Sequence, residues 1–366
     1  MTGHIKAETL RAWLEEGRPV QIIDVRNGED RAQWSIPGSL HIDAYAALSA
    51  GQPSVLAQAA LPVDCPIVTV CNRGVMSERA AEEISARGLA VLSLTGGMKA
   101  WSLAWNIAEH SLKNARVIQV RRTGKGCLSY LIISGGEAVV IDASLPAEVY
   151  LALAGRHGAR IRQVVETHIH ADHLSRSRNL AGKSGAELLL PAQDRVRFPY
   201  NPIVDGAICQ FGSARLKAIA TPGHTMESMC YFLDGEALFT GDTLFISGVG
   251  RPDLHADPEQ ARDRAAVLYR SIQRLLTLPS TALVFPGHMS VPAEFDGVPI
   301  SATLGGIAGG LHRWMDSETE FVDHVMARIP TAPPNYERIV ELNEQGQPPE
   351  GDPTDLEAGA NRCAVL

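Results

Sequence analysis

The sequence predicts two domains: a small α/β domain with a parallel sheet, followed by an α+β sandwich of two stacked sheets with helices outside. The chain has 366 residues, which is more than one ordinary hydrophobic core accommodates. Apolar strand-like runs alternate with helix-like runs over roughly the first hundred residues. Closely spaced apolar runs dominate the next two hundred. We therefore place the domains at residues 1–108 and 112–366.

In the first domain, three short apolar runs at residues 20–25, 66–70 and 90–94 predict buried strands. The run 77–87 consists of strong helix formers, with Ser77 as a plausible N-cap and a glycine just after its end. Strands that alternate with helices usually form a parallel sheet covered on both faces. A parallel α/β domain is therefore expected.

In the second domain, the runs 116–120, 128–133 and 138–141 are so closely spaced that antiparallel pairing is expected. Later apolar runs predict further strands, at 163–166, 187–190, 216–220, 230–233, 237–240 and 282–285. Helical runs lie between them, the longest at 258–276. Many strands with interspersed helices indicate two stacked sheets with outer helices.

Composition restricts the partners. The net charge is −8 and only 5% of residues are aromatic, so neither nucleic acid nor an anionic membrane is an expected partner. The chain shows no secretory leader and no run of eighteen apolar residues, and its six cysteines have no CxxC spacing. We expect a cytoplasmic enzyme. A homodimer is expected only because two-fold assemblies are the commonest.

Seven side chains predict a metal site. His168, His170, Asp172 and His173 fall within six residues, directly after a predicted strand. Three more candidates follow at strand ends beside small residues: His224, Asp242 and His288. A single histidine of this kind is more often structural, but a cluster followed by three spaced ligands is improbable by coincidence.

Two chemistries fit these residue types. Two zinc ions would generate a hydroxide for hydrolysis. One non-haem Fe(II), held by two histidines and one carboxylate, would keep positions open for O₂ and substrate. The ligand residues alone leave both open.

The metal motif resembles the metallo-β-lactamase superfamily, whose HxHxDH signature matches residues 168–173. The resemblance implies an αββα sandwich. It places His168, His170 and His224 at a first metal, the set Asp172, His173 and His288 at a second, and Asp242 between them. In the persulfide dioxygenase branch the resemblance implies iron held by His168, His224 and Asp242. The remaining motif residues then shape the pocket.

Two segments resemble that persulfide dioxygenase branch, residues 126–130 and 248–254. The second implies that Arg251 binds the carboxylate of the thiol carrier, a role suited to its planar fork. The alternative is a structural ion pair with Asp253. Glutathione-using dioxygenases generally have a tyrosine shortly after the last motif histidine, whereas here His288 is followed by Met289. The sequence therefore does not decide whether the thiol carrier is glutathione, coenzyme A or another small thiol.

A second motif is a cysteine loop between a predicted strand and a predicted helix. Cys71 begins it, and the loop continues through Asn72, Arg73, Gly74, Val75 and Met76. A cysteine in this position faces backbone N–H groups and the positive end of a helix, which favour a thiolate. The alternative is a buried, inert thiol.

Residues 1–106 resemble a single-domain rhodanese through the runs 23–26, 36–39 and 96–101. The resemblance implies that Cys71 accepts a sulfane sulfur and passes it to a nucleophile. Met76 stands where that family usually has an arginine, which makes thiosulfate a less secure donor. The same missing arginine argues against a phosphatase-like loop.

Together these motifs favour a fusion of a rhodanese with an iron-dependent persulfide dioxygenase. Its partners would be a small-molecule thiol persulfide, O₂, and sulfite or thiosulfate. One alternative is a dinuclear zinc thioester hydrolase, similar to glyoxalase II, with an accessory rhodanese. In a third hypothesis the first domain only senses or docks, and Cys71→Ala leaves sulfur transfer untouched.

Overall fold

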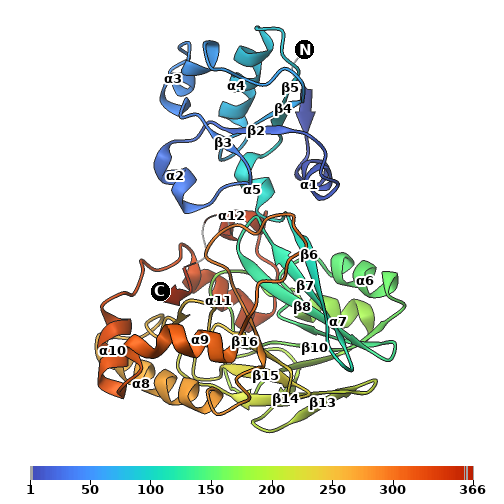
Figure 1. Cartoon of the computed structure of the whole chain (residues 1–366), viewed down its shortest axis with the longest axis vertical. Helices are drawn as coiled ribbons and strands as arrows, with labels where there is room; N and C mark the ends of the chain where they lie inside the picture. Colours follow the sequence, from blue (N-terminus) through green and yellow to red (C-terminus); the bar gives the residue numbers. More distant parts are fainter. Residues whose placement is uncertain (1–2, 358, 360–361, 366) are drawn as a thin grey trace.

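The computed structural model describes residues 3–357, 359 and 362–365. Within them the chain forms two domains stacked along its longest axis (Figure 1). The first domain is a parallel sheet of order β1-β5-β4-β2-β3 with helices around it. Its strands are β1 (Gly3–Ile5), β2 (Gln21–Asp24), β3 (Leu40–His41), β4 (Ile67–Val70) and β5 (Val91–Leu94). Its helices are α1 (Ala7–Glu15), α2 (Gly28–Gln33), α3 (Tyr45–Ser49), α4 (Val75–Ser85) and α5 (Gly97–Trp101). The expected parallel sheet is confirmed.

The start of α4 differs from the sequence prediction. The N-cap is Gly74, in a left-handed conformation, and the helix begins at Val75. Ser77 lies inside the first turn, where its hydroxyl donates to the Gly74 carbonyl. The prediction of Ser77 as N-cap is therefore wrong, because the cysteine loop ends and the helix is capped three residues earlier than expected.

The second domain begins with a sheet of order β12-β11-β10-β9-β8-β7-β6. Its strands are β6 (Asn106–Ser111), β7 (Arg116–Arg122), β8 (Cys127–Ser134), β9 (Glu137–Ile141), β10 (Arg160–Val165), β11 (Glu187–Pro191) and β12 (Asn201–Ile203). Strands β7, β8 and β9 pair antiparallel, as expected. Strand β6 pairs with β7 along its whole length and crosses the predicted boundary. The connection between the domains therefore ends before Asn106, earlier than the sequence indicated.

The other large sheet has the order β13-β14-β15-β16-β18-β19. Its strands are β13 (Ile208–Phe211), β14 (Ala214–Ala220), β15 (Met229–Leu233), β16 (Ala237–Gly241), β18 (Leu283–Pro286) and β19 (Ala302–Thr303). A short ribbon pairs β17 (Val249–Gly250) with β20 (Ala364–Val365). The helices are α6 (Ala147–Arg156), α7 (Ser177–Ser184), α8 (Pro258–Leu275), α9 (Leu304–Leu311), α10 (Glu318–Met326), α11 (Tyr336–Gln345) and α12 (Thr354–Glu357).

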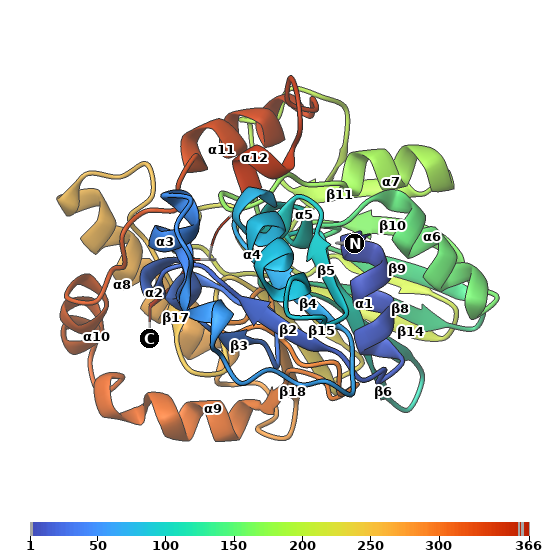
Figure 2. The ribbon, with the colours of Figure 1, turned by 90° about the horizontal axis from the view of Figure 1, so that it is seen from above.

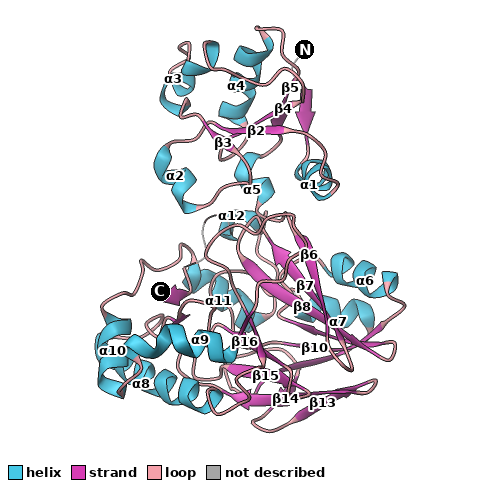
Figure 3. Ribbon diagram, in the orientation of Figure 1, coloured by secondary structure: helices cyan, strands magenta, loops and turns pink. Residues whose placement is uncertain are grey.

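The main core lies between these two sheets. Tyr130 from one sheet meets Phe239 from the other edge to face, with ring centroids 4.9 Å apart. Helices α6 and α7 bury their apolar faces on the outer side of the first sheet, and α8, α9 and α10 do so on the second. Figure 3 shows this helix–sheet–sheet–helix layering, and Figure 2 shows the two groups of helices on opposite sides. The expected αββα sandwich is confirmed.

None of the helices in the described part of the chain has both the length and the apolar composition needed to cross a bilayer.

Candidate metal centre and sulfur-transfer loop

The seven predicted metal-site residues are all buried and converge at one edge of the sandwich. They follow the ends of four strands: β10 precedes residues 168–173, β14 precedes His224, β16 precedes Asp242 and β18 precedes His288. The backbone at Gly287 passes so close to Asp242 that only glycine fits, because a Cβ there would lie 2.6 Å from the Asp242 carboxylate. Strand ends from two sheets thus deliver the side chains to a common centre.

His168, His224 and Asp242 form the first group of candidate ligands. The Asp242 Oδ2 atom lies 3.9 Å from His168 Nε2 and 3.7 Å from His224 Nε2. Neither His168 Nε2 nor Asp242 Oδ2 has a hydrogen-bond partner among the described residues, although both are buried. An ion about 2.1 Å from each ligand spans atoms up to about 4.2 Å apart. The three atoms therefore fit one metal ion.

The opposite edges of these ligands are held by the protein. His224 Nδ1 lies 2.8 Å from the Arg251 carbonyl oxygen, so it donates there and leaves Nε2 unprotonated. His168 Nδ1 lies 2.9 Å from the Thr167 hydroxyl. The second carboxylate oxygen of Asp242 accepts from His288 Nδ1 at 2.6 Å. Such outer contacts fix ring orientation and tautomer in metal sites.

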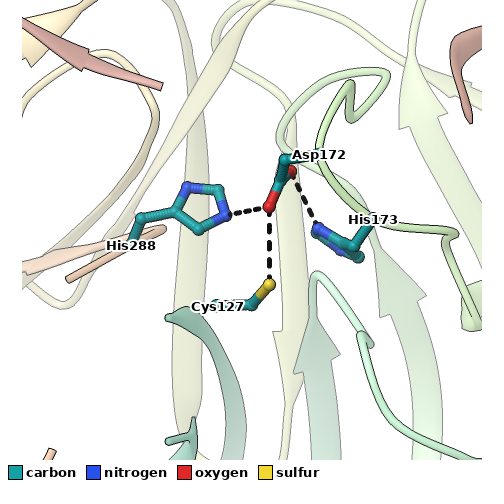
Figure 4. Close-up of side chains that lie close together, drawn as sticks. All are labelled: Cys127, Asp172, His173 and His288. Atoms are coloured by element: carbon teal, nitrogen blue, oxygen red, sulfur yellow. Dashed lines mark hydrogen bonds and ion pairs between the residues drawn. The ribbon is translucent and has the colours of Figure 1, made fainter. Parts of the chain in front are cut away.

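A second group contains Asp172, His173 and His288 together with Cys127 (Figure 4). Asp172 lies at its centre, 3.0 Å from His288 Nε2, 3.0 Å from His173 Nδ1 and 3.5 Å from Cys127 Sγ. Burial raises the pKa of the Cys127 thiol, but the charge on His173 and hydrogen bonds from both histidines lower it to about 6. Sequence analysis missed Cys127 as a candidate ligand, since it begins β8 far from the motif.

His170 lies outside the first group, where metallo-β-lactamase motif position had placed it, although its Nδ1 atom is buried without a hydrogen-bond partner among the described residues. Its Nε2 atom lies 2.8 Å from Glu166 Oε2 and 3.3 Å from Asp142 Oδ1. Burial lowers the pKa of His170, but these two carboxylates hold it well above the usual range. Asp142 also accepts from the Thr167 N–H and hydroxyl. His170 therefore braces the loop that carries His168.

Cys363 approaches the metal region from the far end of the chain. Its sulfur lies within 4.8 Å of ligand atoms of Asp242 and His288, and burial holds its pKa well above the usual range. The sequence did not indicate that Cys363 lies near the metal ligands, because it is the pairing of β17 with β20 that brings Cys363 to this region.

Arg251 does not present its charge to a ligand. Its guanidinium makes two 2.8 Å contacts to the Asp253 carboxylate. The remaining N–H groups donate to three backbone carbonyls, those of Pro330, Thr331 and Arg362. The side chain is 1% exposed. All five donors are used within the chain, so the structure favours the ion pair with Asp253 over the predicted carboxylate anchor.

A cavity of about 670 Å³ borders the motif from the side of His168 and His170. Its walls come largely from α7 and from residues 342–354, and apolar side chains such as Leu188 and Phe198 line it. His224 and Asp242 do not line it. A space of this size accommodates a small organic ligand.

The cysteine loop lies at the carboxyl end of β4. Cys71 is buried, and its sulfur accepts from the Gly74 N–H at 3.1 Å and lies 3.4 Å from the Ser77 hydroxyl. The N–H groups of Met98 and Lys99 hold the carbonyls of Cys71 and Asn72. A Cβ on Gly97 would overlap the Cys71 carbonyl oxygen, and its φ is +57°, so this position requires glycine.

The other loop residues differ in their surroundings. Asn72 donates to Asp30 at 2.7 Å, Arg73 and Val75 are exposed, and Met76 packs partly against the domain core. The predicted strand–loop–helix arrangement is present.

Comparison with known proteins agrees with both halves. Residues 122–288 match the model described as the metallo-beta-lactamase superfamily, and residues 6–104 match the rhodanese-like domain. The hydroxyacylglutathione hydrolase of Rhodospirillum rubrum is 36% identical over 156 residues, which are 42% of this chain and 57% of that protein. That of Anaeromyxobacter dehalogenans is 39% identical over 171 residues, 46% of this chain and 63% of that one. The match thus spans little more than half of these curated relatives.

Two solved structures share the architecture of the larger domain. A metallo-beta-lactamase from Staphylococcus aureus has a TM-score of 0.58 and 27% identity, covering 64% of this chain and 74% of that chain. ETHE1 from Myxococcus xanthus has a TM-score of 0.54 and 28% identity, covering 62% of this chain and 97% of that chain. The buried cluster of metal-ligating side chains, the cysteine loop and these similarities lead to one conclusion: the chain joins a rhodanese-like domain to a metal-binding domain of metallo-β-lactamase fold.

Proposed function

We propose that this protein oxidises a low-molecular-weight thiol persulfide with O₂ to sulfite and moves sulfane sulfur through Cys71. The observation that carries the proposal is the composition of the first ligand group. His168, His224 and Asp242 form a set of two histidines and one carboxylate, and His170 lies outside this group with its Nε2 atom held by Glu166. That ligand set is typical of non-haem iron oxygenases. The similarity to ETHE1 from Myxococcus xanthus supports the same choice.

Ferrous iron at His168, His224 and Asp242 would supply open positions at which O₂ and the persulfide sulfur meet. The overall reaction balances as RSS⁻ + O₂ + H₂O giving RSH, SO₃²⁻ and H⁺. The outer sulfur loses four electrons and O₂ gains them, so no further oxidant is required.

The chain's own contribution is positioning. The Arg251 carbonyl fixes the tautomer of His224, and the Thr167 hydroxyl orients His168. His288 donates to Asp242, which leaves one carboxylate oxygen for the metal. The 670 Å³ cavity beside His168 offers room for the thiol carrier. Because Arg251 is saturated, this proposal assigns it no contact with that carrier.

In the first domain, Cys71 would hold the sulfane sulfur as a persulfide. The Gly74 N–H donates toward Sγ, and partial positive charge at the start of α4 stabilises an anion there. The transferred sulfur would pass to sulfite, giving thiosulfate, or arrive from a donor persulfide.

A second candidate is a dinuclear zinc hydrolase of thioesters. The named relatives favour it, since they are hydroxyacylglutathione hydrolases. The second ligand group favours it too, because Asp172, His173 and His288 could hold a second ion. In this alternative His170 would bind the first metal through Nδ1, which is buried without a hydrogen-bond partner among the described residues, and Nε2 would keep its contacts with Glu166 and Asp142.

Metal content and two activity assays separate these candidates. Protein loaded anaerobically with Fe(II) should bind about one iron per chain. It should then consume O₂ with glutathione persulfide or coenzyme A persulfide and release sulfite. About two zinc ions per chain, with hydrolysis of a glutathione thioester and no persulfide-dependent O₂ uptake, would establish the hydrolase instead.

A further inference from the structure

Strand β17 lies directly against two of the three ligands of the first group. A Cβ added to Gly250 would meet the Asp242 carbonyl oxygen at 1.9 Å and the His224 Cβ at 2.9 Å, so the backbone here touches both residues. The carbonyl of the next residue, Arg251, accepts from His224 Nδ1 at 2.8 Å. The position of β17 therefore determines how His224 and Asp242 are held.

Strand β20 holds the other side of β17. The two strands pair antiparallel, and the Arg251 N–H donates to the Cys363 carbonyl at 3.0 Å. Val365 of β20 is buried in the core beneath the outer helices of the second sheet. The Cys363 sulfur lies within 4.8 Å of ligand atoms of Asp242 and His288. Strand β20 therefore contacts both β17 and the metal region.

The Arg251 guanidinium fastens β20 in this position. It donates to the carbonyl of Arg362, just before β20, and to the carbonyls of Pro330 and Thr331, which follow α10. Two contacts to the Asp253 carboxylate fix the plane of the group. The side chain is buried, so water does not compete for these acceptors. One side chain thus ties three separate segments to β17.

The alternative role, binding of the carrier carboxylate, needs a different geometry. Bidentate binding requires two N–H groups that face the substrate. All five N–H groups of Arg251 are donated within the chain, and Arg251 does not line the 670 Å³ cavity. The two roles also differ in their kinetics, because a carrier anchor acts on KM and a residue that orients metal ligands acts on kcat.

We infer that Arg251 is a positioning residue, which clamps β20 onto β17 and so sets the geometry of His224 and Asp242. Residues 362–365 then belong to the metal centre, although they supply no ligand of the first group. The inference rests on the proposed assignment of that group to the metal. It does not depend on the oxidation of a persulfide.

The first experiment measures Fe(II) affinity of the full-length protein without O₂, by competition with a chelator. Arg251→Gln should weaken binding about 10–100-fold, the range for lost outer contacts of metal ligands. Arg251→Lys should recover only part of this loss, because an ammonium offers three donors in place of five. An affinity equal to that of the wild type in Arg251→Gln would overturn the clamp.

The matched control is Arg121→Gln. Arg121 is also buried and also holds a distant segment, through Asp296 and the carbonyls of Glu294 and Val298, but it contacts none of the first group. This variant should lose stability in urea and keep its affinity for Fe(II). Equal weakening in both variants would show a general effect of lost stability and would also contradict the inference.

Steady-state kinetics at saturating Fe(II) separate the clamp from the carrier anchor. Arg251→Gln should lower kcat for persulfide-dependent O₂ uptake about tenfold and leave the KM for the persulfide unchanged. A raised KM with an unchanged kcat would assign Arg251 to the carrier instead. Wild-type protein that binds Fe(II) but takes up no O₂ would count only against the proposed function, because Fe(II) affinity is measured without turnover.

A second variant tests β20 with Arg251 intact. Val365→Asp places a carboxylate in the apolar core and should detach this two-residue strand. Fe(II) affinity should fall by about as much as in Arg251→Gln. Val63→Asp, at a position 84% exposed in the first domain, is the control and should bind Fe(II) as the wild type does. Unchanged affinity in Val365→Asp would rule out the role of β20.

Discussion

The metal ligands follow four strand ends spread over more than a hundred residues, whereas the sulfur-transfer loop is one contiguous run from Cys71 to Met76. The ligands are held by contacts between two sheets, and the loop is held by one strand, one helix and the backbone of α5. We therefore expect that a substitution in the loop can abolish sulfur transfer with little effect on the stability of the fold. A substitution of a metal ligand should also lower stability, because each ligand is part of a buried polar network.

A buried ion-pair group connects the two regions. Glu357 of α12 binds Arg122 of β7 at 2.9 Å and Arg176 at 2.7 Å. It also accepts from the N–H of Leu174, directly after the metal motif, at 2.7 Å. On the other side of α12, Asp355 holds Lys99. The C-terminal segment thus lies between the metal motif and the sulfur-transfer loop, and the five predictions that follow test how independent those two regions are.

The largest expected effect is that of Cys71→Ala on sulfur transfer. Loss of a nucleophile typically costs roughly 10⁴-fold or more in rate. Persulfide-dependent O₂ uptake should stay at the wild-type rate, because Cys71 contacts no metal ligand. Cys65→Ala, in the same domain, is the control. If O₂ uptake fell together with sulfur transfer, the two regions would not be independent, and unchanged sulfur transfer would support a docking role for the first domain.

Asp242→Ala should have the next largest effect, on metal binding. Removal of contacts around metal ligands already costs about 10–100-fold in metal affinity, so loss of a ligand should exceed that. Metal content, measured after dialysis, should fall together with O₂ uptake, while anaerobic sulfur transfer through Cys71 persists. Asp263→Ala, on the exposed face of α8, should retain its metal. Full metal content in Asp242→Ala would remove this residue from the ligand set.

Glu357→Ala should destabilise the protein as a whole. It leaves the Arg122 guanidinium buried without its counter-ion, which typically costs about 3–5 kcal/mol in the free energy of unfolding. Urea denaturation measures this change, with the exposed Glu318→Ala as control. A loss below about 1 kcal/mol would mean that α12 does not connect the two regions.

The same residue predicts an acid dependence. Burial raises the pKa of Glu357, but the charges of Arg122 and Arg176 lower it from 4.5 to about 2. The folded pKa lies below the unfolded value, so this contribution to stability is complete above a pH of about 4.5 and disappears as the pH falls toward about 2. The wild type should lose more stability than Glu357→Ala across this window.

His170→Gln should have the smallest effect and the most specific one. We expect metal content to stay at about one ion per chain, with a loss of about 1–3 kcal/mol from the broken contacts to Glu166 and Asp142. His168→Gln should lose the ion. Equal metal loss in both variants would favour the hydrolase, since its two-metal site uses both histidines.

Much of the architecture could be predicted because the signals are local. The runs that became β2, β4 and β5 are short and apolar, and the metal motif lies within six residues. Strand β6 was not predicted, since Asn106–Ser111 alternates only weakly and its pairing with β7 depends on a distant partner. The N-cap of α4 was misplaced because a left-handed glycine and not a hydroxyl begins that helix.

By itself, the sequence determined the two folds, the presence of a metal group and the position of the cysteine loop, because each depends on residues that are neighbours in the chain. Only the tertiary structure decided that Cys127 joins the second ligand group, that His170 lies outside the first and that Arg251 is saturated. It alone placed the C-terminal segment between the metal motif and the sulfur-transfer loop. Those outcomes depend on which buried donor meets which acceptor across strands far apart in sequence, and that is settled by packing.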